Sequence, residues 1–161
     1  MKNFAINIEG KEYWVARNIA VACFVFAPRN GEWCILANKR GKGTPDFQGY
    51  WNCPCGYLDF DETIEEAARR EVYEETGINL NYAKFFDFSD DVNANHQNVT
   101  FKYYSILSNA EEIPEIKNRG GENDEVDEVR WIPVSNIHLY NWAFDHDFII
   151  EDLMMKYYAE H

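Results

Sequence analysis

At 161 residues, the chain is long enough for one domain with a substantial core. Its hydrophobic content of 46% and aromatic content of 16% exclude a disordered protein, and no run approaches the ~20 apolar residues of a membrane span. The net charge of −13 argues against non-specific binding to a nucleic-acid backbone, which requires clustered Lys and Arg. We therefore expect a single domain over residues 1–161, with neither nucleic acid nor membrane as a partner.

The first residues contain neither an uninterrupted apolar run nor a small-residue cleavage site, so no secretory leader is predicted. The four cysteines, Cys23, Cys34, Cys53 and Cys55, are then expected to be reduced thiols rather than disulfides. Zinc or redox chemistry at Cys53 and Cys55 is the less favoured alternative, because a structural zinc site needs four ligands. Together these observations predict a cytoplasmic protein.

The first elements along the chain are two hairpins. Residues 4–8 and 12–16 alternate loosely around a Glu-Gly-Lys turn and predict an opening hairpin. Residues 19–27 are apolar on both alternating faces, which is typical of a strand covered on both sides in a layered fold. The Asn30-Gly31 pair after them is a strong hairpin signal, so residues 33–37 are expected to return as the paired strand.

A basic cluster over residues 39–42 and three aromatic residues over 47–51 follow this second hairpin. Lys39 and Arg40 are interpreted either as part of a solvated loop or as a clamp on substrate phosphates. Phe47 and Trp51 are interpreted either as core residues or as a surface that stacks a nucleobase or another flat group. Both alternatives stay open for each pair.

Residues 56–78, GYLDFDETIEEAARREVYEETGI, are the most informative stretch. Residues 62–76 are good helix formers and Gly77 is a suitable stop. At 100° per residue, Glu71, Glu74 and Glu75 fall on one face of this helix. Residues that can pack closely against a sheet continue the same face: Ile64, Ala67 and Ala68.

Three carboxylates within one turn repel one another, and burying them unpaired is costly. A hard divalent cation removes that cost, and Mg²⁺ prefers oxygen ligands while leaving positions for phosphate oxygens. The pairs Glu65–Arg69 and Glu66–Arg70 have the favourable i, i+4 order and are expected on the outer side, where they need no functional interpretation.

The remaining elements are strands, a long loop and a helix. Residues 82–88, 99–107 and 126–132 are rich in aromatic and β-branched residues and predict strands. Residues 108–125 predict a long loop, which is more often functional than idle in a compact domain. Residues 145–158 carry apolar side chains at helical spacing and predict a final helix.

Seven residues of the 56–78 stretch occur at the offsets of the Nudix box: Gly56, Glu62, Arg70, Glu71, Glu74, Glu75 and Gly77. The sequence therefore resembles the Nudix hydrolases, which are metal-dependent enzymes that split diphosphate bonds. The resemblance implies an α/β fold, namely an α/β/α sandwich with a mixed central sheet, in which the box forms a loop–helix–loop.

The resemblance also implies a metal site. Glu74 and Glu75 would be the principal ligands of Mg²⁺, with Mn²⁺ as an alternative. Glu71 would be a further ligand or the residue that positions the attacking water, and the backbone carbonyl of Gly56 would complete the metal shell. Cys55 departs from the pattern, because many members have a glycine there, and its side chain puts the substrate assignment in doubt more than catalysis.

Two further contributions follow from the resemblance. Arg70 and Glu62 would form a pair that orients the glutamates. Some members take a general base from a loop outside the box, and here residues 111–128 carry eight acidic against two basic side chains, a net charge of −6. Glu122, Asp124 and Glu125 lie in that acidic stretch, with Glu122 and Glu125 as the candidate catalytic residues; a merely solvated loop is the alternative.

The expected function is Mg²⁺-dependent hydrolysis of a diphosphate bond by water. Residues 142–150, WAFDHDFII, resemble the C-terminal segment of several ADP-ribose-type members and their regulatory relatives, which favours ADP-ribose or nucleotide-sugar substrates over nucleoside triphosphates. The alternatives are a non-catalytic, nucleotide-sensing module and an isomerase of prenyl diphosphates. The intact box, and the lack of room for a basic DNA-binding domain, weigh against the sensing module. A homodimer is the one protein partner left open.

Overall fold

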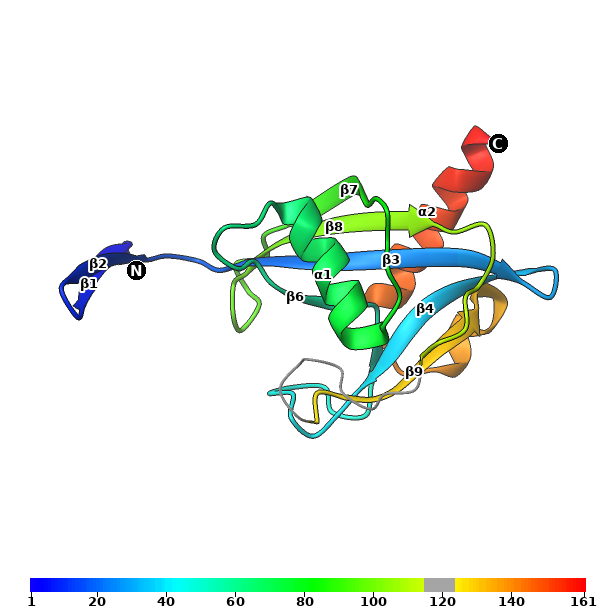
Figure 1. Ribbon diagram of the computed structural model, residues 1–161, viewed down its shortest axis with the longest axis horizontal. Helices are drawn as coiled ribbons and strands as arrows, with labels where there is room; N and C mark the ends of the chain where they lie inside the picture. The colour runs from blue at the N-terminus through cyan, green and yellow to red at the C-terminus, as the bar shows by residue number, and fades with distance from the viewer. Residues whose placement is uncertain (115–123) are drawn as a thin grey trace.

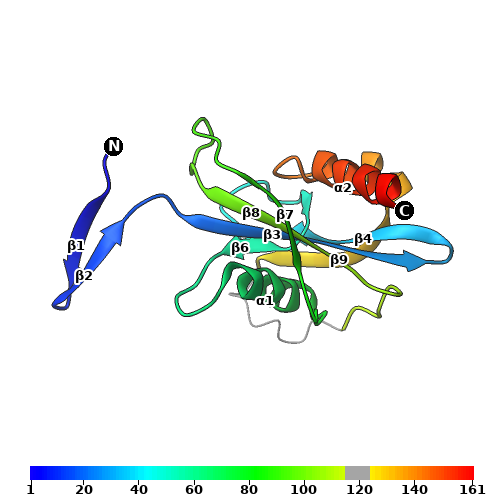
Figure 2. The same cartoon turned by 90° about the horizontal axis from the view of Figure 1, so that it is seen from above.

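The computed structural model describes residues 1–114 and 124–161. A mixed β-sheet lies between two helices, with α1 (Ile64–Thr76) on one face and α2 (His146–Glu160) on the other (Figure 2). The predicted α/β/α sandwich is therefore confirmed. No helix within the described ranges is long and apolar enough to cross a membrane.

The sheet is mixed because β3 pairs with one neighbour in parallel and with the others antiparallel. Within the described residues its order is β5-β4-β3-β8-β7, with β6 also paired to β3 and β9 to β4. The β3–β8 pair is parallel, whereas β3–β4, β4–β9 and β7–β8 are antiparallel. The strand bounds are β3 Ile19–Arg29, β4 Glu32–Arg40, β5 Trp51–Asn52, β6 Cys55–Tyr57, β7 Lys84–Ser89, β8 Val99–Ile106 and β9 Val126–Pro133.

Both predicted hairpins are confirmed. Asn30 and Gly31 have φ values of 52° and 80°, and this left-handed pair closes the turn between β3 and β4. The opening hairpin consists of β1 (Phe4–Ile8) and β2 (Lys11–Val15). It pairs only within itself among the described strands and stands away from the sandwich (Figure 1).

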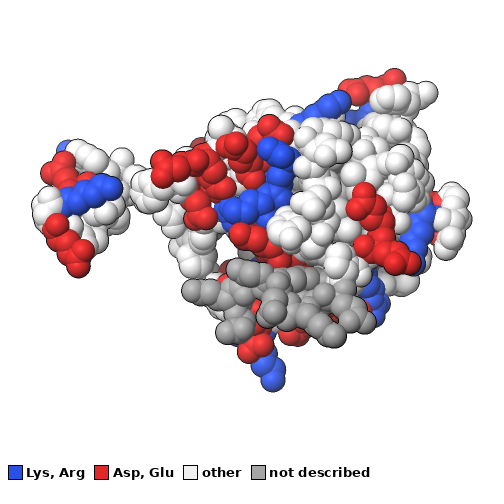
Figure 3. Space-filling model, in the orientation of Figure 1, with Lys and Arg blue, Asp and Glu red and all other residues white. Residues whose placement is uncertain are grey.

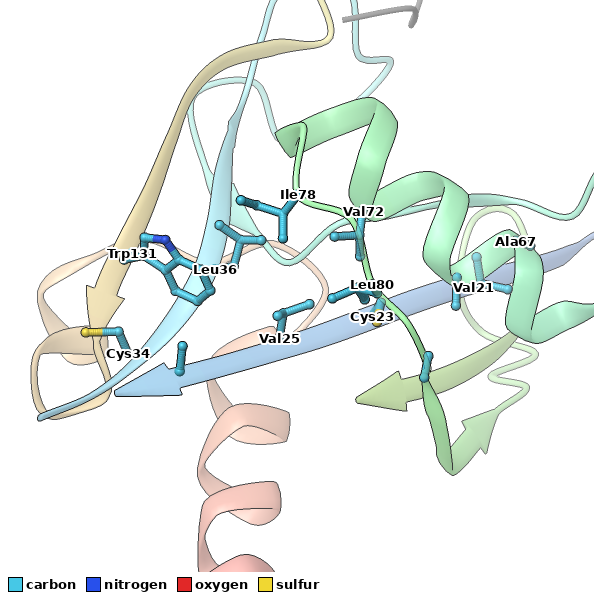
Figure 4. Close-up of a cluster of buried hydrophobic side chains, with 13 residues drawn as sticks. Val21, Cys23, Val25, Cys34, Leu36, Ala67, Val72, Ile78, Leu80 and Trp131 are labelled. Carbon is cyan, nitrogen blue, oxygen red and sulfur yellow. The ribbon is translucent and has the colours of Figure 1, made fainter. Parts of the chain in front are cut away.

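Alternate side chains of β3 supply two hydrophobic clusters, one on each face of the sheet. Val21 and Val25 face α1, where they join Leu36, Val72 and Trp131 (Figure 4). On the α2 side, the cluster contains Phe24, Ile35, Ile132, Ile150 and Leu153. Burial on both faces explains why residues 19–27 are continuously apolar rather than alternating.

Helix α1 has strong local signals at both ends. Thr63 caps its N-terminus, and Thr63 and Glu66 exchange the two hydrogen bonds of a capping box. Gly77 ends it in the left-handed region, at φ 77°, as its composition predicts. Helix α2 confirms the predicted final helix, and the 3₁₀ helix η1 (Val134–Leu139) precedes it.

Candidate active site

Helix α1 brings its acidic side chains to the edge of the core. Ala67 and Ala68 are fully buried against the sheet, so the helix packs closely along the stripe that the projection predicts. One turn further along, Glu71 is 9% exposed and Glu75 is half-buried. The side chain of Glu74 is more accessible, with 36% exposed. The three carboxylates therefore lie between the apolar core and solvent.

Gly56 on β6 lies directly against the carboxylate of Glu71. A Cβ atom at position 56 would stand 2.2 Å from Oε1 of Glu71, far inside van der Waals contact. Glycine fits here because the backbone lies close to the carboxylate of Glu71, and not because the position has a positive φ angle. Any larger residue at 56 would displace Glu71.

Arg70 donates five hydrogen bonds, four of which hold acidic side chains in place. Its Nε and Nη2 donate to both oxygens of Glu62, at 2.9 and 2.8 Å, and Nη2 also donates to the carbonyl of Tyr57. Its Nη1 donates to Glu71 at 2.7 Å and to Glu74 at 3.0 Å. These hydrogen bonds lower the pKa of the Glu62 carboxyl. Figure 3 shows basic side chains lying among acidic ones over α1.

The predicted outer pairs differ in outcome. Glu65 and Arg69 lie 3.4 Å apart, as expected for an i, i+4 pair. The Glu66–Arg70 pair is wrong, because Glu66 turns back to the backbone of Thr63 and Arg70 turns inward. Each residue has a better partner than the other. Glu66 accepts from an N–H at the helix N-terminus that would otherwise be unsatisfied, and Arg70 binds the partly buried carboxylates.

Burial and mutual repulsion make two of the carboxylates hard to ionise. Burial raises the pKa of Glu71 to about 6, although its hydrogen bond from Arg70 opposes this shift. Burial raises the pKa of Glu75 well above its usual value, and the charge of Glu71 raises it further. The N–H of Cys55 and the charge of Arg40 act in the opposite direction on Glu75. A bound cation would relieve both burdens.

Cys55 belongs to a line of polar groups that reaches Glu75 from inside the sheet. Its backbone N–H donates to Oε2 of Glu75 at 3.2 Å, and its sulfur accepts from Nδ2 of Asn52 at 3.1 Å. Asn52 in turn accepts from Asn38 at 3.0 Å, and both amides are buried. Burial, and then the charge of Glu75, raise the pKa of the Cys55 thiol, which stays neutral. Cys55 therefore sits in an ordinary strand and supports Glu75.

A buried histidine from α2, His146, supports the segment between β5 and β6. It was not identified from the sequence. Nδ1 of His146 accepts from the backbone N–H of Cys53 at 3.0 Å, across 93 positions of sequence. Its ring packs edge-on against Phe24, with centroids 5.1 Å apart. Burial lowers the pKa of His146 to about 3, so the ring is neutral and can accept. The signal for it lies only in the WAFDHDFII resemblance, which carries no role for the histidine.

The donor set fits a hard divalent cation, although it is not gathered into a finished metal site. Among the described residues, no three acidic, histidine or cysteine side chains are already placed to hold a metal together. Glu71 and Glu74 are engaged by Arg70, and Glu75 by the N–H of Cys55. The donors are nevertheless all oxygens, and the backbone of Gly56 closely approaches the carboxylate of Glu71. The metal-ligand assignment stays a prediction.

The predicted phosphate clamp is only partly available. Arg40 is 8% exposed, pairs with Asp46 at 2.6 Å and lies over the ring of Phe144 at 4.8 Å. Its charge still reaches Glu75, whose pKa it lowers. Lys39 is half-buried on β4, opposite Trp51 on β5 and Glu128 on β9.

The two aromatic residues named from the sequence have different surroundings. Trp51 is 6% exposed within the α2-side cluster, so the core interpretation applies to it. Phe47 is 45% exposed and contacts the rings of Tyr50 and Phe144, with centroids 5.5 and 5.2 Å away. Phe47 and Phe144 also have positive φ, at 48° and 60°, an uncommon conformation that clusters at functional sites.

The second acidic stretch begins beside the basic loop. The carbonyls of Asp124 and Glu125 accept hydrogen bonds from Gly43 and Gly41, both at 2.8 Å. The charge of Glu125 contributes to raising the pKa of Glu75, which places this side chain within electrostatic reach of the cluster. Glu122 lies outside the described residues.

Solved structures of similar fold come from several bacteria. The NUDIX domain of Shewanella oneidensis NrtR, complexed with ADP ribose, has a TM-score of 0.73 and 23% identity over 88% of this chain and 89% of that one. A bifunctional NMN adenylyltransferase/ADP ribose pyrophosphatase from Francisella tularensis, complexed with AMP and a Mn ion, has a TM-score of 0.66 and 28% identity over 88% of this chain and 42% of that one.

Sequence comparison finds similarity to curated and family sequences. Phosphatase NudJ of Escherichia coli (strain K12) is 41% identical over 61 residues, which are 38% of this chain. The match spans 35% of that relative, about a third of its length. The model of the NUDIX domain matches residues 16–153. The described site, with Arg70 joining Glu62 to the carboxylates beside Gly56, lies within this match. The chain belongs to the Nudix family.

Proposed function

We propose that this protein hydrolyses the diphosphate bond of a nucleoside diphosphate derivative, with Mg²⁺ as its cofactor. The observation that carries the proposal is the group of Glu71, Glu74 and Glu75 on one face of α1, with Glu71 pressed against the backbone of Gly56. Burial raises the pKa of Glu71 and Glu75, and a bound cation would offset the cost of keeping both carboxylates ionised. Members of the family generally use divalent cations.

Each residue of the cluster has a proposed part. Glu74 and Glu75 would hold Mg²⁺ or Mn²⁺, with Glu71 and the carbonyl of Gly56 completing the set. The bound cation supplies electrostatic stabilisation of the charge that builds on the diphosphate. Arg70 and Glu62 do not touch the reacting atoms; they fix the directions of Glu71 and Glu74 through the hydrogen bonds described above.

The reaction is substitution by water at phosphorus. The water oxygen forms a bond to one phosphorus atom, and the bond from that phosphorus to the bridging oxygen breaks. A carboxylate takes the proton that the water loses, and the bridging oxygen leaves with the second phosphate. The charge of Glu125 acts on Glu75, which supports the proposal of Glu125, together with Glu122, as a candidate for this base.

ADP-ribose and nucleotide sugars are the proposed substrate class, ahead of nucleoside triphosphates. The Francisella tularensis relative is named for ADP ribose pyrophosphatase activity and binds AMP with a Mn ion. The Shewanella oneidensis NrtR domain binds ADP ribose. The resemblance of residues 142–150 to ADP-ribose-type members points the same way, and Phe144 lies within that segment.

An exposed aromatic surface is proposed to bind the flat part of the substrate. Phe47, Tyr50 and Phe144 form it, with 45%, 40% and 39% exposed, and the guanidinium of Arg40 lies over Phe144. Stacking of a base on such rings contributes about 1–3 kcal/mol. Arg40 lies over Phe144 and its charge also reaches Glu75, so it would contact the phosphates on exchanging Asp46 for them.

The test is a panel of diphosphate compounds with Mg²⁺ or Mn²⁺ and products identified by mass. We expect ADP-ribose or a nucleotide sugar to yield a mononucleotide and a sugar phosphate. Glu74→Gln should lose most of that activity, because it removes a proposed metal ligand with little change of shape. Glu151→Gln, which removes an exposed glutamate on α2, is the matched control and should keep wild-type activity.

Two results would contradict the proposal. Absence of product from the whole panel at every metal concentration, with ligands still binding, favours the nucleotide-sensing alternative. Equal losses of activity in Glu74→Gln and Glu151→Gln would contradict the proposal that the metal binds on α1.

A cytoplasmic location is proposed on a separate ground. The four cysteines are all free thiols, as expected in a reducing compartment: Cys23, Cys34, Cys53 and Cys55.

A further inference from the structure

A cavity of about 300 Å³ lies between the C-terminal half of α2 and the sheet, and we call it the α2 cavity. Figures 1 and 2 both place this half of α2 near the end of the sheet where β3 turns into β4. Phe26 lines the cavity, whereas Gly56, which lies against Glu71, pairs with Val21, five positions back along β3. That is about 17 Å along a strand. Val21 and Phe26 also belong to clusters on opposite faces, so the α2 cavity is separate from the carboxylates of α1.

The walls of the α2 cavity are largely aromatic. Trp33 of β4 and Tyr157 of α2 both line it, with their rings edge to face at a centroid distance of 5.4 Å. Phe86 of β7 and Tyr104 of β8 line it from the sheet. Trp33, Phe86 and Tyr104 also pack against the α2-side cluster, so their rings are held in place while part of each stays accessible. Fixed rings of this kind suit a planar ligand, which can pack offset or edge-on against them.

Two lysines bring positive charge to the same cavity, one from the sheet and one from the helix. The ammonium of Lys84 lies 5.7 Å from the ring centroid of Tyr82, and that of Lys156 lies 4.4 Å from the ring centroid of Phe86. Within the described ranges, Lys84 forms no ion pair. Lys156 pairs with Asp152 at 3.0 Å, but both side chains are exposed, and such a pair contributes little. Both ammonium groups can therefore turn toward a ligand.

The charge of the α2 cavity contrasts with that of the whole chain. Among the side chains that line it, two lysines stand against one carboxylate, that of Glu160, whereas the chain carries a net charge of −13. His161 adds a further flat surface, because its ring stacks on that of Tyr157 at 4.5 Å. The volume lies at the lower end of the roughly 300–1,000 Å³ of small-molecule sites, which suits one or two fused rings.

We propose that the α2 cavity is a second binding site, for a planar aromatic compound that carries a carboxylate or phosphate group. The ring of the ligand would lie among Trp33, Phe86 and Tyr157. Its anionic group would accept hydrogen bonds from the ammonium groups of Lys84 and Lys156. Two kinds of compound share this chemistry: simple aromatic acids, and nucleoside monophosphates, which are the class of product that the proposed hydrolysis would release.

The test is a titration of the metal-free full chain, followed by calorimetry and by the NMR signal of the Trp33 indole N–H. The probes are indole-3-acetate, 5′-AMP and the neutral indole-3-ethanol. We expect at least one anionic probe to bind and to shift the Trp33 signal. Indole-3-ethanol should bind at least about 10-fold more weakly than indole-3-acetate, because it lacks the charge that strengthens hydrogen bonds from lysine. The indole N–H groups of Trp131 and Trp142 donate to backbone carbonyls outside the cavity and serve as internal references.

Lysine variants test the charged part of the site. Lys84→Met and Lys156→Met should each weaken binding of the anionic probe about 10-fold and leave indole-3-ethanol unaffected. Lys11→Met is the matched control, because Lys11 also lies over a tyrosine ring, 5.2 Å from the centroid of Tyr13, but outside the cavity. This control should bind every probe as wild type does.

Aromatic variants test the wall of the cavity. Tyr157→Ala should weaken binding of all three probes, whereas Tyr157→Phe should retain it, because the ring and not the hydroxyl supplies the surface. Phe148→Ala removes an exposed aromatic side chain of α2 that does not line the cavity, and it should bind as wild type does.

Three results would overturn the proposal. The first is the absence of both heat and a Trp33 shift with either anionic probe. The second is equally tight binding of indole-3-ethanol and indole-3-acetate. The third is equal binding by Lys156→Met and Lys11→Met. Binding of indole-3-acetate alone would identify aromatic acids as the ligand, and binding of AMP would identify nucleoside monophosphates. No readout involves diphosphate hydrolysis, so each result stands whether or not the proposed function does.

Discussion

The two faces of the sheet divide the work of building the site. On the α1 side, small residues such as Ala67 and Ala68 let the helix approach closely and bring three carboxylates to the core edge. On the α2 side, packing is by large side chains such as Ile150 and Leu153, and the polar contribution of α2 is a single buried histidine, His146. The carboxylates lie on one face, while part of their support comes from the other.

The loop from β5 to β6 connects the two faces. His146 accepts from the N–H of Cys53, and two residues later the N–H of Cys55 donates to Glu75. A change in α2 can therefore reach a proposed metal ligand through three residues of rigid backbone. The α1 face therefore supplies the carboxylates and, through Arg70, positions Glu71 and Glu74. The α2 face supplies no carboxylate and only helps to position Glu75. Substitutions that break one or the other should separate activity from stability.

The largest expected effect is on the α1 face, from Arg70→Ala. This change frees Glu62, Glu71 and Glu74 together, so we expect diphosphate hydrolysis to fall about 10–100-fold, the usual cost of losing a partner that orients metal ligands. The metal concentration needed for half-maximal rate should rise as well, which a merely structural role would not produce.

Two further variants make the Arg70 test specific. Arg70→Lys should not restore activity, because an ammonium cannot reproduce the two-pronged contact with Glu62. Arg69→Ala removes the neighbouring, partly exposed ion pair with Glu65, which has no contact with the carboxylate cluster, and should leave both rate and metal requirement close to wild type. Similar losses of activity in Arg70→Ala and Arg69→Ala would show that activity depends on the positive charge on α1 and not on the hydrogen bonds of Arg70.

The α1 face was the more predictable of the two for a physical reason. Its stop at Gly77 and the common face of Glu71 and Glu74 both depend on residues within one or two helical turns. The Asn30-Gly31 turn is local in the same sense. Local rules do not choose between competing partners, however, and this is why the Glu66–Arg70 pair was wrong.

The α2 face depends on contacts that only the folded chain creates. The partner of His146 is 93 positions away, and nothing around it in the sequence distinguishes a buried acceptor from a surface histidine. Arg40 is a similar case, since its pairing with Asp46 and Phe144 follows from how two loops meet. The proposed ligands and the Arg70–Glu62 pair could be named from the sequence, whereas the support from His146 could not.

The next largest effect tests the α2 face through His146. Replacing it by Leu leaves the buried N–H of Cys53 without an acceptor, which should lower the free energy of unfolding by about 1–3 kcal/mol. His146→Asn is the matched control, because its amide oxygen can occupy the place of Nδ1. Urea unfolding should rank the two variants in that order, and equal stability would show that this hydrogen bond contributes nothing.

The same residue predicts a pH dependence. Burial lowers the pKa of His146 from 6.5 to about 3, so below pH 6.5 the unfolded chain binds a proton that the folded chain does not. Stability is therefore lost as pH falls from 6.5 toward 3, at up to about 1.4 kcal/mol per pH unit. Between pH 7 and 5, wild type should lose about 2 kcal/mol more than His146→Asn.

The comparison with His146→Asn is needed because Glu71 acts in the opposite direction. Its pKa is raised from 4.5 to about 6, so its contribution is fully present below pH 4.5 and lost as pH rises through 6. Subtracting the variant cancels this contribution, since both proteins contain Glu71. Parallel stability curves for wild type and His146→Asn would mean that the folded protein protonates this histidine as readily as the unfolded chain does.

The smallest expected effect concerns the buried amides that join β4 to β5. Asn52→Leu leaves the donor of Asn38 unpaired and removes the donor to Cys55, and Asn38→Leu leaves Oδ1 of Asn52 unpaired. Within the described part of the chain, Oδ1 of Asn38 already has no hydrogen bond. Each single change should therefore cost about 1–2 kcal/mol, whereas the double change to Leu removes both unpaired groups together.

The double change is thus expected to cost about 1 kcal/mol less than the sum of the two single changes, as measured by urea unfolding. Additive losses would mean that the two amides act independently. Activity supplies the second measurement, because only Asn52 contacts Cys55, whose N–H holds Glu75. If Asn52 supports Glu75 through Cys55, Asn52→Leu should raise the metal concentration needed for half-maximal rate more than Asn38→Leu does. The reverse order would show that, of the buried residues behind Cys55, only His146 helps to position the carboxylates.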